Sequence, residues 1–148
     1  MMKKIHFSIE INASREKVWQ TLWEKESFEK WTSAFAEGST YALDSWEEGE
    51  KIQFLGPQGH GMVSNIDHLI PNEYMSFRHL AEMKDGVEQP VSEKAEEWSG
   101  LATESYRLEE KDGITHLGVE LDVMEKEEEY FLKSFPTGLE YVKNLAEK

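Results

Sequence analysis

The sequence predicts an α+β fold in which a curved antiparallel sheet wraps around one long C-terminal helix. Three observations lead to this prediction: an alternating strand with two short helices at the start, strands and tight turns through the middle, and a helix with one apolar stripe at the end. A strand cannot bury its apolar face alone, so the simplest arrangement lays the helix across the concave face of the sheet. The 148 residues are expected to form a single domain over residues 1–148.

The first strand is expected at 3–11, where apolar and polar side chains alternate from Ile5 to Ile11. Residues 12–14 offer capping oxygens for a helix that follows. That helix has apolar side chains at helical spacing, namely Val18, Trp19, Leu22 and Trp23. A second short helix carries Phe28 and Trp31.

The middle of the chain is typical of strands joined by tight turns. Strands are expected at 41–46, 51–55, 61–69, 73–80, 101–109 and 114–123. Asp112 and Gly113 supply the positive-φ residues that a two-residue hairpin turn needs. The segment 81–100 is the least regular, and Ser92 could cap one short helix within it. This segment is interpreted either as a lid over a cavity or as a surface excursion packed by Trp98.

The last element is predicted to be a long helix with a single apolar stripe. Asp122 or Val123 is expected to end the preceding strand, and the pair Asp122 and Glu125 matches a helix-capping pattern. Pro136 and Gly138 interrupt the helix, and Pro136 is expected to kink it. The stripe consists of Phe131, Phe135, Leu139, Val142 and Leu145.

Composition excludes several classes of function. The formal charge of −14 disfavours nucleic acid and anionic membrane surfaces as partners. The absence of Cys removes disulfides, thiolate nucleophiles and Cys-based zinc sites. No cofactor motif is present, and His60 and His68 lack the spacing of a metal site, so neither a cofactor nor a metal is expected. Without an export signal or a membrane span, a cytoplasmic location is the default expectation.

Four segments resemble a known superfamily: residues 9–19, 28–31 (Phe-Glu-Lys-Trp), 74–77 (Tyr-Met-Ser-Phe) and 119–122 (Val-Glu-Leu-Asp). They are similar to the SRPBCC proteins, also called START-like or birch-pollen-allergen-like, which have the helix-grip fold. The nearest branch is that of the heat-shock-ATPase activator homologues. The resemblance implies a deep cavity between helix and sheet for lipids, sterols, polyketides or other apolar molecules. Some relatives are cyclases or aromatases, and others bind a chaperone.

A set of large apolar side chains is the candidate lining of such a cavity. The same residues could simply fill a core, because most aromatic stripes do so. The candidates are Trp31, Phe35, Phe54, Met75, Phe77, Tyr106, Phe131, Phe135 and Leu139.

Two polar residues are expected on the same apolar faces. If Phe77 points inward, alternation sends His79 the same way, and if Tyr106 points inward, Glu104 follows it. The pair could orient a ligand, and it is also the candidate acid–base pair of an enzyme. A single β-bulge would reverse these orientations.

Three functions are therefore open. The first is binding of an apolar small molecule, with His79 and Glu104 orienting it. The second is a cyclase or aromatase that uses these two residues catalytically. The third is a regulatory module with a protein partner such as a chaperone. The chain is expected to be a monomer or homodimer.

Overall fold

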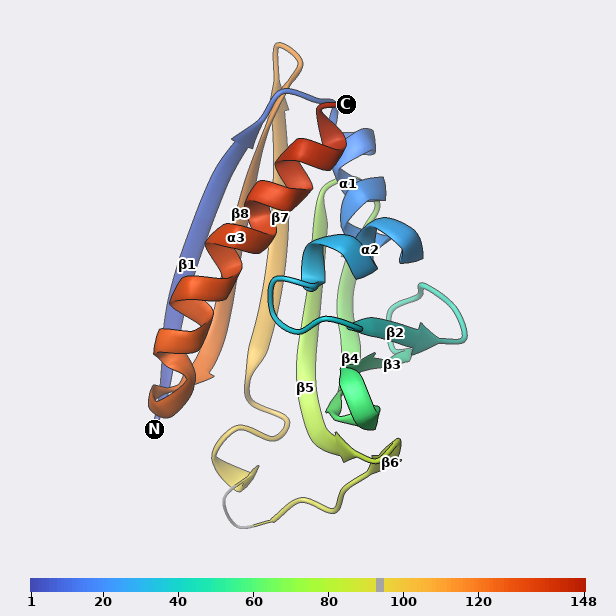
Figure 1. Cartoon of the computed structure of the whole chain (residues 1–148), viewed down its shortest axis with the longest axis vertical. Coiled ribbons are helices and arrows are strands. Elements are labelled where there is room, and N and C mark those ends of the chain that lie inside the picture. Colours follow the sequence, from blue (N-terminus) through green and yellow to red (C-terminus); the bar gives the residue numbers. More distant parts are fainter. Residues whose placement is uncertain (93–94) are drawn as a thin grey trace.

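The computed structural model describes residues 1–92 and 95–148 and confirms the predicted helix-grip architecture (Figure 1). A strand and two short helices lead into the remaining strands, and a long helix ends the chain. The first three elements along the chain are β1 (Met2–Ile11), α1 (Arg15–Trp23) and α2 (Lys25–Thr32). The others are β2 (Thr40–Leu43), β3 (Lys51–Leu55), β4 (Gly61–Ile70), β5 (Tyr74–Lys84), β6 (Val87–Glu88), β7 (Thr103–Lys111), β8 (Ile114–Met124) and α3 (Glu128–Ala146), with 3₁₀ turns at Pro57–Gly59, Ala95–Glu97 and Glu125–Glu127.

The strands form one eight-stranded sheet in the order β1-β8-β7-β5-β4-β3-β2, and β6 pairs with β5. Every pair in the described chain is antiparallel. Figure 1 shows α3 running along one face of this sheet, with α1 and α2 beside the half of α3 nearer the C-terminus. The concave face is thus covered by helices.

The core lies between this face and the helices. On β1, Ile5 and Ile11 are buried, and the Phe7 ring stacks on Phe135 of α3 with centroids 5.0 Å apart. The indole of Trp31 is buried and donates to the Leu22 carbonyl oxygen at 3.0 Å, which ties α2 to α1. Burial of such large side chains supplies most of the folding free energy.

Local signals at two points work as predicted. Ser14 Oγ accepts a hydrogen bond from the Lys17 backbone N–H at 3.2 Å and caps α1. Asp112 and Gly113 both have positive φ, 53° and 80°, in the turn between β7 and β8.

The predicted cap of α3 is wrong. Strand β8 continues to Met124, since residues up to Met124 pair with β1, and α3 begins only at Glu128. The Asp122 carboxylate therefore lies on a strand, where it accepts from the Thr103 N–H at 3.0 Å and pairs with Lys4 at 3.0 Å. The helix then continues through Pro136 and Gly138, so neither residue ends it.

The segment 81–100 is more regular than predicted at its start, because β5 runs on to Lys84 and pairs with β6. Ser92 caps the following turn by accepting from the Ala95 N–H at 3.3 Å, as predicted. Residues 93 and 94 of the predicted helix lie outside the described residues. None of the described helices is long and apolar enough to cross a membrane.

Candidate functional site

A cavity of about 430 Å³ lies between the concave face of the sheet, α2 and the first turns of α3. Its wall is mostly apolar and rich in aromatic rings. The end of α1, helix α2 and the connection to β2 form one side, the segment from β3 to β4 forms the second, and β5, β7 and α3 form the rest. The lining residues are Trp23, Phe28, Trp31, Thr32, Phe35, Ala36, Ser39, Thr40, Phe54, Leu55, Gly56, Pro57, His60, Gly61, Met62, Phe77, His79, Glu104, Tyr106, Tyr130, Phe131 and Phe135.

Most of the candidate residues come together in this wall. Met75 and Leu139 do not. Met75 points to the inner side but lines a separate hollow beside α1, and Leu139 is buried in the core one turn further along α3. The candidates that line the cavity are Trp31, Phe35, Phe54, Phe77, His79, Glu104, Tyr106, Phe131 and Phe135.

The polar side chains of the wall form one connected chain. His79 Nε2 lies 3.3 Å from Glu104 Oε1, and the Tyr106 hydroxyl donates to Glu104 Oε2. The other ring nitrogen, His79 Nδ1, lies 2.7 Å from Ser64 Oγ, which is fully buried. A register shift between Val63 and Ser64 places a bulge at Leu80, just after His79, so the predicted orientation of His79 survives.

The Glu104 carboxylate determines which of these linked side chains donate hydrogen bonds and which accept them. An ionised Glu104 can only accept, so His79 presents Nε2–H to it, and in a neutral ring Nδ1 then accepts from the Ser64 hydroxyl. Burial, followed by the adjacent Glu104 charge, raises the pKa of Tyr106 well above its usual value, which keeps the phenol protonated as a donor. Both nitrogens of His79 are thus occupied by protein groups, which favours positioning of Glu104 over acid–base work by the imidazole.

A second cavity of about 310 Å³ adjoins the first. The two share Met62, His79, Glu104 and Phe131, so the Glu104 carboxylate stands at their junction. The segment 81–100 borders this smaller cavity, through residues such as Trp98, and none of its described residues lines the larger one. The predicted lid therefore lies beside the second cavity.

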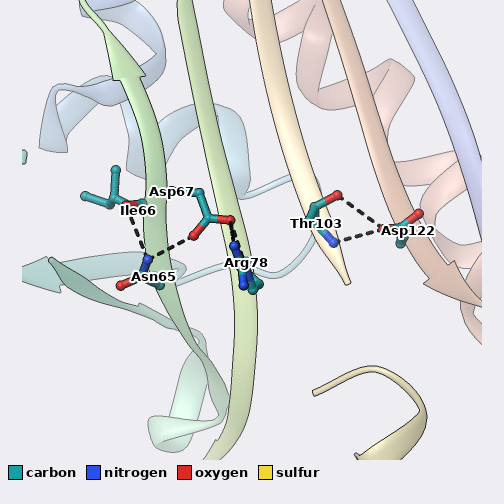
Figure 2. Close-up of polar contacts among 6 residues, drawn as sticks. All are labelled: Asn65, Ile66, Asp67, Arg78, Thr103 and Asp122. Atoms are coloured by element: carbon teal, nitrogen blue, oxygen red, sulfur yellow. Dashed lines mark hydrogen bonds and ion pairs between the residues drawn. The ribbon is translucent and has the colours of Figure 1, made fainter. Parts of the chain in front are cut away.

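Contacts on the outer face of the sheet hold the strands that carry His79 and Glu104 (Figure 2). Arg78 lies next to His79 and binds Asp67 through Nε and a terminal nitrogen, both at 2.8 Å. Asp67 occupies a bulge in β4 and also accepts from Asn65 at 2.9 Å. Thr103, which precedes Glu104, pairs with Arg78 in register and is held by Asp122.

The exposed members of the wall mark where the cavity opens. Pro57, His60 and Tyr130 are exposed, so the opening lies between the β3–β4 connection and the start of α3. The Tyr130 hydroxyl donates to the Phe35 carbonyl oxygen across one edge of it. Sequence reasoning missed Tyr130, although it directly precedes Phe131 of the stripe.

Two other features of the described chain are less suited to bind an apolar ligand or a metal. A groove of about 530 Å³ crosses the outer face of β1, β8 and β7, but polar side chains such as His6, His116 and Arg107 line it. Among the described residues, no group of three or more His, Cys, Asp or Glu side chains could hold a metal ion.

Comparison with protein families identifies the family of this chain. Residues 12–142 match the family described as Activator of Hsp90 ATPase homolog 1-like protein. The chain belongs to this family. The match spans the cavity wall from α1 to most of α3. A comparison with curated proteins found no match.

Solved structures share the fold of this family member. The Aha1 dimer from Colwellia psychrerythraea is 22% identical, with a TM-score of 0.70 over 98% of this chain and 96% of that one. Protein CV1439 from Chromobacterium violaceum is 17% identical, with a TM-score of 0.69 over 98% and 97%. Ara h 8.0201 is 8% identical, with a TM-score of 0.65 over 99% and 98%. These identities establish the fold alone.

Proposed function

We propose that the protein binds an apolar small molecule in the 430 Å³ cavity between the sheet, α2 and α3. The observation that carries the proposal is the aromatic wall. Sites for small molecules typically measure about 300–1,000 Å³ and combine apolar walls with a few polar groups. Here the polar groups are chiefly the linked His79, Glu104 and Tyr106.

The affinity would come from removing apolar surface from water. A ligand that buries about 200 Å² gains about 5 kcal/mol at roughly 25 cal/mol per Å², before the cost of association is subtracted. The rings are already packed against one another, as between Phe35 and Phe135 with centroids 4.8 Å apart. A wall held in this way loses little side-chain freedom when a ligand binds.

Binding of the neutral dye Nile red, whose fluorescence rises in apolar surroundings, tests this proposal. We expect saturable binding by the natural protein and at least about tenfold weaker binding by Ala36→Phe, because the added ring occupies the cavity that Ala36 lines. Ala42→Phe is the matched control, since Ala42 is exposed on β2 and outside the cavity wall. The proposal is wrong if the natural protein binds no dye, or if Ala36→Phe binds it equally well.

Family membership supports a second candidate, regulation of a chaperone ATPase of the Hsp90 type. Apolar side chains on α3 would suit a protein contact, because Leu132 and Tyr141 are exposed. The assay is the ATPase rate of an Hsp90-type chaperone with and without this protein. If the rate rises equally with Ala36→Phe, the regulatory role is independent of the cavity. Size-exclusion chromatography of the same samples distinguishes monomer from homodimer.

A further inference from the structure

The polar chemistry of the cavity wall is one-sided. Among the described residues that line the larger cavity, Glu104 is the only carboxylate and there is no Lys or Arg. Lys84 and Lys126 border the smaller cavity. The partners of Glu104 in the wall are the His79 ring, whose Nε2 lies 3.3 Å from Oε1, and the Tyr106 hydroxyl, which donates to Oε2. The side chain keeps 20% of its surface exposed and stands at the junction of the two cavities. A carboxylate offers about four acceptor positions, and the protein fills two of them.

The donors of the wall are already used. Only the ring of His60, at the exposed opening, and the indole N–H of Trp23 lack a protein acceptor among the described residues. The Trp23 nitrogen is buried and has almost no accessible surface. The hydroxyl and N–H groups that donate to protein oxygens are those of Trp31, Thr32, Ser39, Thr40, His79, Tyr106 and Tyr130.

Inside the larger cavity and away from its opening, a ligand therefore meets an acceptor, and the described wall offers it no exposed unpaired donor. A carboxylic acid in its ionised form would leave water, find no donor and face the Glu104 charge, which costs free energy. An ammonium group would pay a large desolvation penalty that an ion pair repays only in part. A hydroxyl group pays the smallest such cost and gains a charge-assisted hydrogen bond to Glu104.

We propose that the ligand is an apolar alcohol or phenol whose hydroxyl donates to the Glu104 carboxylate at the junction of the two cavities, with its apolar body in the larger one. This proposal rests on the proposed binding function and names the class of ligand. Within the larger cavity, fatty acids and other apolar anions are disfavoured, because its described wall provides no cationic partner. The net charge of −14 acts in the same direction, since it lowers the local concentration of anions.

Three compounds of one ring system test the proposal by calorimetry at neutral pH: 2-naphthol, 2-naphthoate and 2-methylnaphthalene. We expect 2-naphthol to bind at least about tenfold more tightly than 2-naphthoate, in keeping with a hydrogen bond to a charged group. In Glu104→Gln, the preference for 2-naphthol over 2-naphthoate should fall to about threefold or less. Affinity for 2-methylnaphthalene, which makes no hydrogen bond, should stay the same and so report that the cavity is intact.

The outcomes separate this proposal from the binding function. If the natural protein binds all three compounds without preference, or prefers 2-naphthoate, the alcohol proposal is overturned and the binding function stands. If it binds none of them and no Nile red, the binding function itself fails. If Glu104→Gln does not fold, the order of affinities in the natural protein still decides, and Tyr106→Phe provides the second variant. The Tyr106→Phe variant keeps the Glu104 carboxylate, so this variant should still prefer 2-naphthol over 2-naphthoate. Loss of that preference would count against Glu104 as the acceptor of the ligand hydroxyl.

Discussion

Single residues on the outer face of the sheet hold the strand that carries Glu104, the carboxylate that we propose accepts the ligand hydroxyl. Thr103 begins β7, immediately before Glu104, and both its N–H and its hydroxyl donate to Asp122. Burial alone would raise the pKa of Asp122. The hydrogen bonds from Thr103 and the Lys4 ammonium outweigh burial, so that this pKa lies below its usual value of 3.8. Asp122 therefore contributes to stability as an anion.

Replacement of Asp122 by Asn should lower the free energy of unfolding by about 1–2 kcal/mol at pH 7, because two hydrogen bonds lose their charged acceptor. A carboxyl whose pKa is lower in the folded state stabilises the fold above the unfolded-state pKa. That contribution disappears as pH falls through the folded-state pKa. The difference between the natural protein and Asp122→Asn should thus be complete at pH 7 and shrink below about pH 4. Urea unfolding at both pH values measures it.

Glu120→Gln is the control for Asp122→Asn. Glu120 pairs with the same Lys4 at 3.3 Å, but its side chain is 44% exposed and Thr103 donates to Asp122 instead. Exposed pairs contribute little, so a change of less than about 0.5 kcal/mol is expected. An equal loss of stability in the two variants would show that Lys4, and not Thr103, accounts for the role of Asp122.

How far single side chains could be placed from sequence depended on the bulges. Alternation along β5 put His79 beside Phe77 on the inner face, and the structure agrees because the bulge at Leu80 comes one residue later. Nothing in the sequence fixes the position of that bulge. Met75 obeys the same alternation, yet it lies too close to α1 to reach the cavity. The direction of a side chain was predictable, and its depth along the strand was not.

Among the elements, α2 and α3 lie in close contact at Gly138. A Cβ built there would lie 3.3 Å from the Trp31 carbonyl oxygen and 3.3 Å from a ring carbon of Phe35. Both residues line the cavity. In the sequence, Gly138 looked like an interruption of the helix, but its role is to let the two helices meet. Such a contact depends on the partner helix and is invisible in a local pattern.

Gly138→Val should therefore destabilise the protein by about 1–3 kcal/mol, since the added methyl groups press on the backbone of α2. Thr137→Val, one residue earlier and exposed, introduces the same side chain into α3 and should change stability by less than about 0.5 kcal/mol. Thermal and urea unfolding of the two variants give the comparison. Similar effects at both positions would mean that the helix itself, and not the contact with α2, resists valine.

The start of α3 shows why another local signal failed. Asp122 and Glu125 match a capping pattern, but pairing between β8 and β1 continues to Met124 and claims these residues for the sheet. Long-range strand pairing outweighs a cap that contributes about 1 kcal/mol. At Ser14 no strand competes, and the cap forms as predicted.

Over the whole molecule, the two ends of α3 are held differently. Near the C-terminus, Lys143 Nζ donates to the Glu10 carbonyl oxygen at 3.0 Å and the Asn12 N–H donates to Glu147 at 2.8 Å. At the other end, the hydrogen bond from Tyr130 to Phe35 crosses the edge of the cavity opening. The nearby ion pair of Lys3 and Glu128 has Lys3 half exposed and contributes little. Ligand passage should therefore involve the start of α3.

Tyr130→Phe tests this route, because it removes the bond to Phe35 and keeps the aromatic ring. A hydrogen bond worth about 1 kcal/mol corresponds to about a fivefold change in rate, so 2-naphthol should dissociate about fivefold faster. Equilibrium affinity should change less, since both opening and closing become easier. Tyr141→Phe, on the exposed side of the same helix and outside the cavity wall, should leave the rate unchanged in stopped-flow displacement. An unchanged rate in Tyr130→Phe would move the route away from α3, toward the smaller cavity beside the segment 81–100.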